Sequence, residues 1–126
     1  MSTIIATVCL AANVFSCTPM EIKVIDGDTI HIRSEKIRVL GIDAPEIKGN
    51  CQSEVVLAQK AKRRLADLIG GNQIVIDRQG RDKYRRTLAK ITLGNRDIGS
   101  ILMSEGLARK WESKWRPGLD EIWCSN

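Results

Sequence analysis

One long amphipathic segment, flanked by short strand-like runs, is the feature that most constrains how this chain can fold. Apolar residues recur at helical spacing along one face of residues 53–69, and Gly70 and Gly71 follow directly. The residues on that face are Ala58, Ala61, Leu65 and Leu68. This spacing predicts an α-helix that buries one stripe, with Ser53 as its N-terminal cap and the two glycines as its stop.

Short runs rich in β-branched residues lie on both sides of this helix. Five strands are expected, at 21–25, 30–33, 37–42, 73–77 and 87–93. Asp97 would cap a second, shorter helix that ends at Gly106. The resulting order, β-β-β-α-β-β-α, predicts a mainly β domain of the α+β class. It suits a small five-stranded barrel of the OB type with a short C-terminal tail, although element order alone does not select that fold.

Size and charge set broad limits on function. The chain has 126 residues, of which 43% are hydrophobic, so we expect one globular domain. Its net charge of +5 favours a polyanionic partner, although simple solubility explains a basic balance equally well. The local clustering of positive charge, at 60–64 and again at 78–86, is more informative than the total.

Carboxylates gather where the strand-like runs end. Asp26 and Asp28 flank Gly27, and Asp43 follows the third run, three residues before Glu46. Clustered like charges are costly unless something neutralises them, and a hard cation with oxygen ligands does so well. By itself each segment also has a simpler interpretation, an ordinary hairpin turn at 26–28 and a solvated loop glutamate at 46.

Two arginines complete the set of charged residues. Arg38 lies in the third run, five residues before Asp43, and Arg86 ends the segment 82–86. A guanidinium offers planar, bidentate donors that match phosphate oxygens and remains charged at any working pH. Each could equally be a solvated surface charge, but together with the carboxylates they indicate chemistry on a phosphodiester.

In order and spacing, the segments 26–29, 38–46 and 82–86 resemble the staphylococcal nuclease (thermonuclease) family, over roughly residues 21–107. The resemblance implies an OB-fold barrel. It also implies a calcium-dependent, sequence-nonspecific nuclease that hydrolyses DNA and RNA, preferably single strands, and leaves 3′-phosphate products. We expect it to act as a monomer.

The resemblance also assigns roles to individual residues. It implies Ca²⁺ ligands at Asp28, Asp43 and the backbone carbonyl of Ala44, with Asp26 nearby. Glu46 would be the general base, and Arg38 and Arg86 would stabilise the transition state. Substrate contacts would come from Lys83, Tyr84, Trp111 and Trp115. The two tryptophans would stack on bases, although they are as readily explained as a cover for the barrel, and Tyr84 could instead be partly buried.

The chain departs from the family pattern near Arg86. Arg85 stands where the family usually has glycine. If that position requires a positive φ, the arginine carries strain of about 1–2 kcal/mol. The loop after Glu46 is also short, which predicts a stiffer rim beside the general base.

The N-terminus has the composition of a targeting segment. Residues 4–15 are apolar except for Thr7 and Asn13. A helical membrane span needs about 20 residues, so the run has the length of a signal-peptide core instead. We therefore expect residues 1–16 to be a signal peptide, residues 17–126 to be the mature domain, and the protein to be secreted or periplasmic. A buried first strand is the alternative.

Four cysteines allow three pairings. If Cys9 leaves with the signal peptide, Cys51 and Cys124 are expected to form a disulfide, and Cys17 would be left free or would carry a lipid anchor. Four reduced cysteines in a cytosolic protein are the alternative.

A competing function class is a binding module. Some nuclease-like domains have lost catalytic residues and only bind nucleic acid or protein. The intact set of carboxylates and arginines disfavours that interpretation here, and a generic OB-fold binder does not need Glu46. His31, the only histidine, is expected to be structural.

Overall fold

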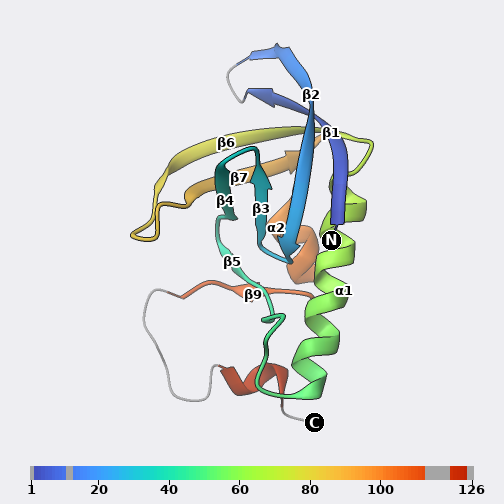
Figure 1. Cartoon of the computed structure of the whole chain (residues 1–126), viewed down its shortest axis with the longest axis vertical. Helices are drawn as coiled ribbons and strands as arrows, with labels where there is room; N and C mark the ends of the chain where they lie inside the picture. The colour runs from blue at the N-terminus through green and yellow to red at the C-terminus, as the bar shows by residue number, and fades with distance from the viewer. Residues whose placement is uncertain (1, 11–12, 113–119, 125–126) are drawn as a thin grey trace.

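The computed structural model describes residues 2–10, 13–112 and 120–124, which form a small mixed barrel with two helices packed beside it (Figure 1). The strands up to the first helix are β1 (Ser2–Leu10), β2 (Asn13–Asp26), β3 (Thr29–Ile32), β4 (Glu35–Val39) and β5 (Ile42–Asp43). The later strands are β6 (Gln73–Arg81), β7 (Thr87–Leu93), β8 (Arg96–Asp97) and β9 (Arg109–Lys110). The helices are α1 (Gln52–Ile69), α2 (Ile98–Ser104) and the 3-10 turn η1 (Asp120–Trp123).

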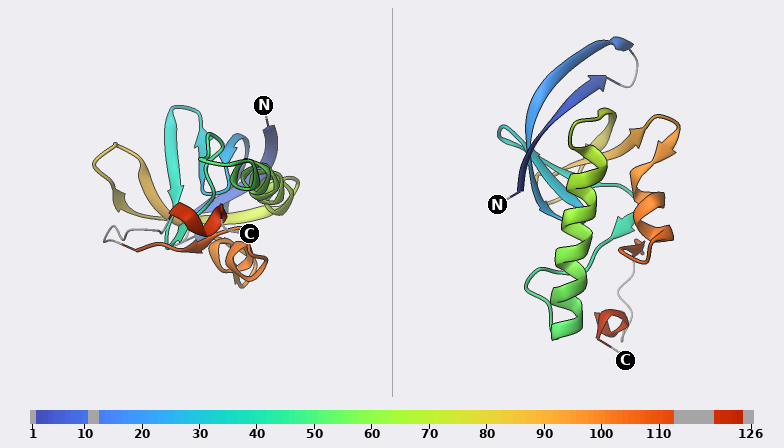
Figure 2. Two further views of the ribbon diagram at one scale, coloured as in Figure 1. Left: turned by 90° about the horizontal axis from the view of Figure 1, so that it is seen from below. Right: turned by 90° about the vertical axis from the view of Figure 1, so that its right-hand side faces the viewer.

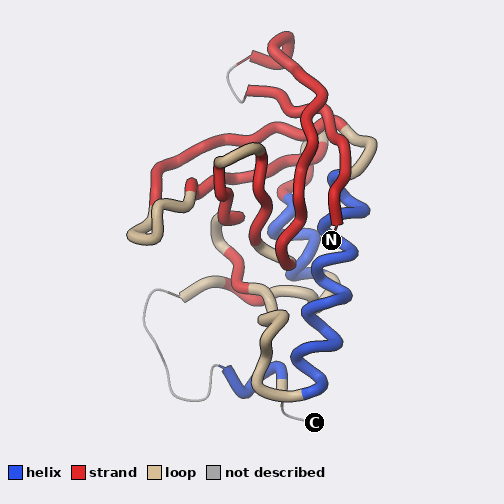
Figure 3. Tube along the Cα trace, viewed as in Figure 1, coloured by secondary structure: helices blue, strands red, loops and turns tan. Residues whose placement is uncertain are grey.

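Six strands close the barrel, in the order β4-β3-β2-β1-β6-β7, with β4 pairing back onto β7 (Figure 3). Five of them, β2, β3, β4, β6 and β7, are the strands that the sequence predicts, and the OB-type fold is confirmed. The sixth is β1, which runs antiparallel to β2 and parallel to β6. The third predicted strand ends earlier than expected, at Val39, because the chain turns at Gly41 with φ +83°.

The barrel interior is filled mainly by isoleucine and valine. Successive side chains of a strand point to opposite faces, so every second residue of each predicted run reaches the core. The fully buried members include Ile22, Val24, Ile30, Ile37, Ile74, Ile76 and Ile91. Burial of each such side chain contributes about 1.5–3 kcal/mol, which fixes the strand register and thereby the strand ends that carry the polar residues.

Helix α1 runs along one side of the barrel and packs against β1 and β2 (Figures 1 and 2). The four residues predicted to face inward are all buried. The helix ends as expected, with Gly70 as its C-cap and Gly71 at φ +74°. The predicted cap is wrong: Cys51 is the N-cap, without a side-chain cap, and the Ser53 hydroxyl donates instead to the Trp123 carbonyl at 2.7 Å.

The second helix follows the sequence prediction. Asp97 caps α2 by accepting a hydrogen bond from the Ser100 amide at 2.9 Å, and Ile98, Ile101 and Leu102 face the core. Neither helix in the described part of the chain combines the length and apolar character that crossing a membrane requires.

Residues 2–10 form strand β1, which contributes buried Ala6, Val8 and Cys9 to the barrel. This is the alternative that the sequence left open for the apolar N-terminus, whereas removal of residues 1–16 stays a prediction. Cys9 is paired with Cys17 in a disulfide, so the free or lipidated Cys17 expected from the sequence is not what the structure shows.

The predicted disulfide between Cys51 and Cys124 is present. It joins the start of α1 to η1, which lies beside the first turn of the helix (Figure 2).

Candidate functional site

The predicted carboxylates and Arg38 converge where β2, β4 and β5 end and β3 begins. Asp28 lies in the tight turn between β2 and β3, and this turn packs directly on its neighbours. A Cβ at Gly27 would lie 2.7 Å from the Ala61 Cβ of α1 and 2.9 Å from the Ala44 Cβ. Only glycine therefore allows Asp28 to approach the segment after β5.

Asp28 is the most deeply buried acid of the predicted set, at 6% exposed. One of its carboxylate oxygens accepts a hydrogen bond from the Ala44 amide at 2.8 Å, and the other accepts from the Thr29 hydroxyl at 2.9 Å. Burial, together with the negative charge of Asp26, raises the pKa of Asp28 to about 6, against the opposing effect of Arg38. Asp26 in turn accepts the Asp28 amide at 3.0 Å.

Arg38 connects the two predicted metal-binding carboxylates. Its Nη1 lies 3.2 Å from Asp28 Oδ2, and its Nη2 lies 3.7 Å from Asp43 Oδ1. Nη1 also donates to the Ile42 carbonyl at 2.9 Å, which fixes the guanidinium at the end of β4. The sequence predicted this grouping correctly.

Arg109 is a site residue that the sequence analysis missed. Its Nε and Nη2 lie 3.0 Å and 2.9 Å from Asp43 Oδ2, because β9 pairs with β5 in a register that sets Arg109 opposite Asp43. The two residues are 66 positions apart, and a two-residue strand leaves no pattern in the sequence that would have shown the pairing.

Glu46 lies in the loop between β5 and α1, and its side chain is exposed at the rim of the site. Its pKa is raised, first by burial and then by the negative charges of Asp28, Asp43 and Glu54. A carboxylate whose proton affinity is raised in this way is better suited to accept a proton from water than an ordinary surface glutamate. Glu54, a buried residue of the first turn of α1, was also missed by the sequence analysis.

The charges in this region fit a bound cation. Five carboxylates gather here: the charge of Asp26 raises the pKa of Asp28, and the charges of Asp28, Asp43 and Glu54 raise the pKa of Glu46. Two guanidinium groups, Arg38 and Arg109, oppose them among the described residues. Such a set of hard oxygen donors with excess negative charge matches what Ca²⁺ prefers in proteins.

A hollow of about 340 Å³, lined in part by Arg38 and by Ile42 next to Asp43, gathers most of the remaining predicted residues. Its lining includes Arg38, Lys83, Tyr84, Arg86 and Trp111. The structure thus brings both predicted catalytic arginines to one surface, together with three of the four predicted substrate contacts. Trp115 lies outside the described residues.

The hairpin that carries Arg86 is organised by Asp82. This carboxylate accepts the amides of Tyr84 and Arg86, each at 2.9 Å, and pairs with Arg86 Nε at 2.7 Å. Arg85 has φ +65°, so the position does take the left-handed conformation expected from the glycine that the family has there. An arginine in that conformation carries strain of about 1–2 kcal/mol.

Two aromatic side chains project from this surface. Tyr84 is 65% exposed, which excludes burial in the core, and its ring lies 5.2 Å from Lys83 Nζ and 5.4 Å from the Arg86 guanidinium carbon. Trp111 is 51% exposed and is anchored through its amide, which donates to the Gly41 carbonyl at 2.9 Å.

The fold and the site define an OB-type barrel with a carboxylate–arginine centre at one end. Residues 36–121 match the family model described as staphylococcal nuclease homologue. The chain belongs to the staphylococcal nuclease family.

Several relatives agree with that assignment. A thermonuclease of Staphylococcus intermedius is 41% identical over 107 residues, covering 79% of this chain and 61% of the relative. An uncharacterized endonuclease of Haemophilus influenzae is 32% identical over 110 residues, covering 83% of this chain and 58% of the relative. A thermonuclease of Staphylococcus hyicus is 37% identical over 99 residues, covering 70% of this chain and 56% of the relative. The chain thus spans little more than half the length of these relatives.

Proposed function

We propose that this protein is a calcium-dependent nuclease that hydrolyses phosphodiester bonds of DNA and RNA without sequence preference and leaves 3′-phosphate ends. The observation that carries the proposal is the convergence of Arg38 on Asp28 and Asp43, at 3.2 Å and 3.7 Å, beside Glu46. Relatives described as thermonuclease and endonuclease support it. A protein that only bound nucleic acid would have no need of carboxylates beside phosphate.

In the proposed reaction, Glu46 accepts a proton from a water molecule as the water oxygen bonds to phosphorus. The bond from phosphorus to the 5′ oxygen breaks, and that oxygen takes a proton from solvent to become a 5′-hydroxyl. Negative charge grows on the phosphate oxygens, and preplaced guanidinium groups of Arg38 and Arg86 stabilise it. Asp28, Asp43 and the Ala44 carbonyl would hold Ca²⁺, which when bound supplies further positive charge beside the phosphate.

The hollow beside the arginines suggests how the strand binds. Lys83 would contact a terminal phosphate, and the exposed rings of Tyr84 and Trp111 offer faces on which bases or sugars can pack. Stacking on an aromatic ring contributes about 1–3 kcal/mol per base and tolerates any sequence. Contacts of this kind favour single strands and explain the proposed lack of sequence preference.

A catalytically impaired nucleic-acid-binding module is the competing function. One observation favours it: Arg86 is paired with Asp82 and follows the strained Arg85, an arrangement that would hold the guanidinium away from the phosphate.

Replacement of Glu46 separates the two functions. Glu46→Gln keeps the shape of the side chain but removes the proton acceptor, and a general base contributes typically about 10²- to 10⁴-fold to rate. We expect kcat on heat-denatured DNA to fall by at least about 100-fold, while the Kd for a non-cleaved oligonucleotide changes little. Equal activity of the variant and the wild type would remove Glu46 from the mechanism.

A further inference from the structure

We propose that Glu54 is the residue that positions Glu46 for catalysis, by holding both ends of the loop that carries it. This inference rests on the proposed nuclease function. Glu54 Oε2 accepts the backbone amide of Glu46 at 3.0 Å, and Oε1 accepts that of Asn50 at 2.9 Å. One carboxylate therefore closes the loop 46–50 on itself and fixes it to the first turn of α1.

Burial shows that this carboxylate is not an ordinary solvated helix residue. Glu54 is only 3% exposed, whereas an acid in the first turn of a surface helix normally points into water. Burying a carboxylate is costly unless its oxygens are hydrogen-bonded. Two amide donors and the positive end of the α1 dipole offset that cost here.

Gly49 shows how closely the loop is fitted around this group. A Cβ at Gly49 would lie 2.6 Å from Glu54 Cγ and 2.7 Å from Glu54 Cδ, and 2.9 Å from the Glu46 carbonyl oxygen. Any residue larger than glycine would push the loop or the carboxylate aside. Gly49 thus leaves room in the loop for the Glu54 side chain.

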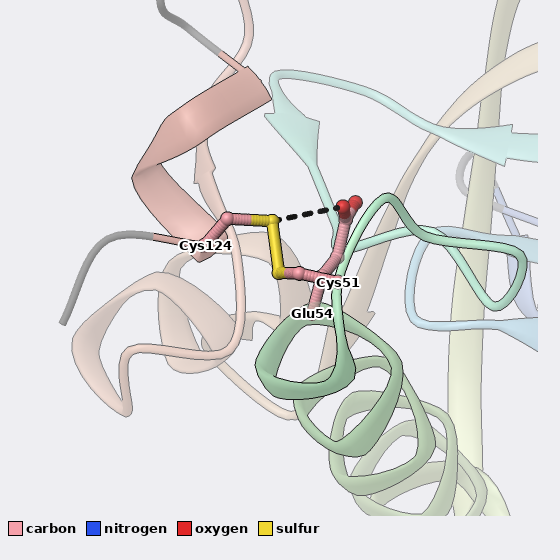
Figure 4. A group of neighbouring side chains, drawn as sticks. All are labelled: Cys51, Glu54 and Cys124. Carbon is pink, nitrogen blue, oxygen red and sulfur yellow. Dashed lines mark hydrogen bonds between the residues drawn. A yellow bond between two sulfur atoms is a disulfide. The ribbon is translucent and has the colours of Figure 1, made fainter.

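The disulfide between Cys51 and Cys124 covers the remaining side of the carboxylate (Figure 4). Cys124 Sγ lies 3.9 Å from Glu54 Oε1. The two sulfurs and the carboxylate lie close enough to suggest a metal site, but sulfurs bonded to each other are not thiolates and do not serve as metal ligands. The disulfide instead covers the Glu54 carboxylate, which orients the loop.

Glu54 contacts the backbone of Glu46 and leaves its side chain free to accept a proton. It therefore acts through Glu46. A misplacement of a reacting group by about 1 Å can cost about 100-fold in rate, so loss of this anchor should lower kcat without weakening the substrate contacts of the arginines.

The test is a double-mutant cycle in the full chain, with kcat and KM measured on heat-denatured DNA in calcium. Glu54→Gln keeps the shape but has one acceptor oxygen instead of two, so one loop amide loses its partner. We expect kcat to fall by about 10- to 100-fold with KM changed less than about twofold. In a Glu46→Gln background the same substitution should cost less than about twofold, because its effect passes through Glu46.

A matched control and a second variant keep the test decisive. Glu105→Gln removes a carboxylate that pairs with Arg64 at the surface, and it should leave kcat unchanged. Gly49→Ala perturbs the same contact from the loop side while keeping Glu54, so it decides the matter if Glu54→Gln does not fold. Hydrogen exchange of the Glu46 and Asn50 amides should accelerate in both loop variants.

The outcomes distinguish the positioning role of Glu54 from the proposed nuclease function. Wild-type kcat in Glu54→Gln or in Gly49→Ala would overturn the positioning role, as would an equal loss in the Glu46→Gln background. An inactive wild-type protein would overturn the proposed function and, with it, this inference.

Discussion

At the scale of single residues, Glu35 shows how one side chain joins three strands of the barrel. It begins β4 and accepts two hydrogen bonds from Arg78 of β6, both at 2.8 Å, and one from the Thr87 hydroxyl of β7 at 2.9 Å. The Arg78 hydrogen bonds lower the pKa of Glu35, with Thr87 adding to the effect against burial.

This contact predicts a pH-dependent contribution to stability. Because the folded protein binds the Glu35 proton less tightly than the unfolded chain, the contribution is present above the ordinary pKa of 4.5 and is lost as pH falls through the lowered value. Glu35 and Arg78 are 30% and 38% exposed, so we expect Glu35→Gln to cost only about 0.5–1 kcal/mol at pH 7. Urea unfolding of the variant and the wild type at pH 7 and pH 3 measures this difference in the free energy of unfolding.

Glu21→Gln, at an exposed position of β2, is the control for that experiment. An equal loss of stability at both pH values in Glu35→Gln would contradict the assignment, because it would not depend on ionisation.

The sequence predicted the residues of the site that are close together in the chain. Asp28, Arg38, Asp43 and Glu46 could be placed together because the order and spacing of the segments 26–29 and 38–46 resemble the family pattern. Arg109 could not, because its pairing depends on a tertiary contact. Glu54 could not, because nothing in a helical pattern distinguishes a buried first-turn glutamate from a solvated one.

At the scale of secondary structure, β1 is the element that the sequence described least well. An apolar run of this length fits a signal-peptide core and a buried strand equally, since composition records hydrophobicity but not the partner that buries it. In the structure it lies between β2 and β6 and closes the barrel. Helix α1 was easier to predict because its period of 3.6 residues specifies the buried face locally.

We propose that the chain is exported, and this proposal makes a direct prediction about β1. The apolar length of 4–15 suits signal-peptide recognition, so protein recovered from the periplasm should begin near Cys17. N-terminal sequencing and intact mass measure this. Recovery of a chain that begins at Met1 would contradict cleavage and leave β1 in the mature domain.

In the full chain, with residues 1–16 retained, the two disulfides should differ in their effect on stability. Loop-closure entropy grows with the length of the closed loop, and the sequence separations are 73 residues for Cys51–Cys124 and 8 residues for Cys9–Cys17. The entropic model gives about 4 kcal/mol for the first and about 2.5 kcal/mol for the second. Paired alanine substitutions at each disulfide, compared by urea unfolding, should therefore rank in that order; the reverse order would contradict this explanation.

At the scale of the whole molecule, the barrel provides a rigid frame and the loops at one end provide the chemistry. The β2–β3 turn, β5 and the loop before α1 supply the carboxylates, while the hairpin 82–86 and Trp111 supply the adjoining hollow. The resemblance to the family predicted this overall plan, because the order of its segments specifies which strand ends meet. Strand β1 and the disulfide between Cys9 and Cys17 lie outside residues 21–107, so the resemblance could not predict them.

The most direct test of the nuclease assignment is hydrolysis of heat-denatured DNA by the purified chain, first in calcium and then in EGTA. We expect cleavage in calcium, products that end in 3′-phosphate, and loss of cleavage in EGTA, because the excess carboxylates at the strand ends need a cation to offset their charge. Binding of DNA without cleavage under any metal ion would contradict the nuclease assignment and establish the binding module in its place.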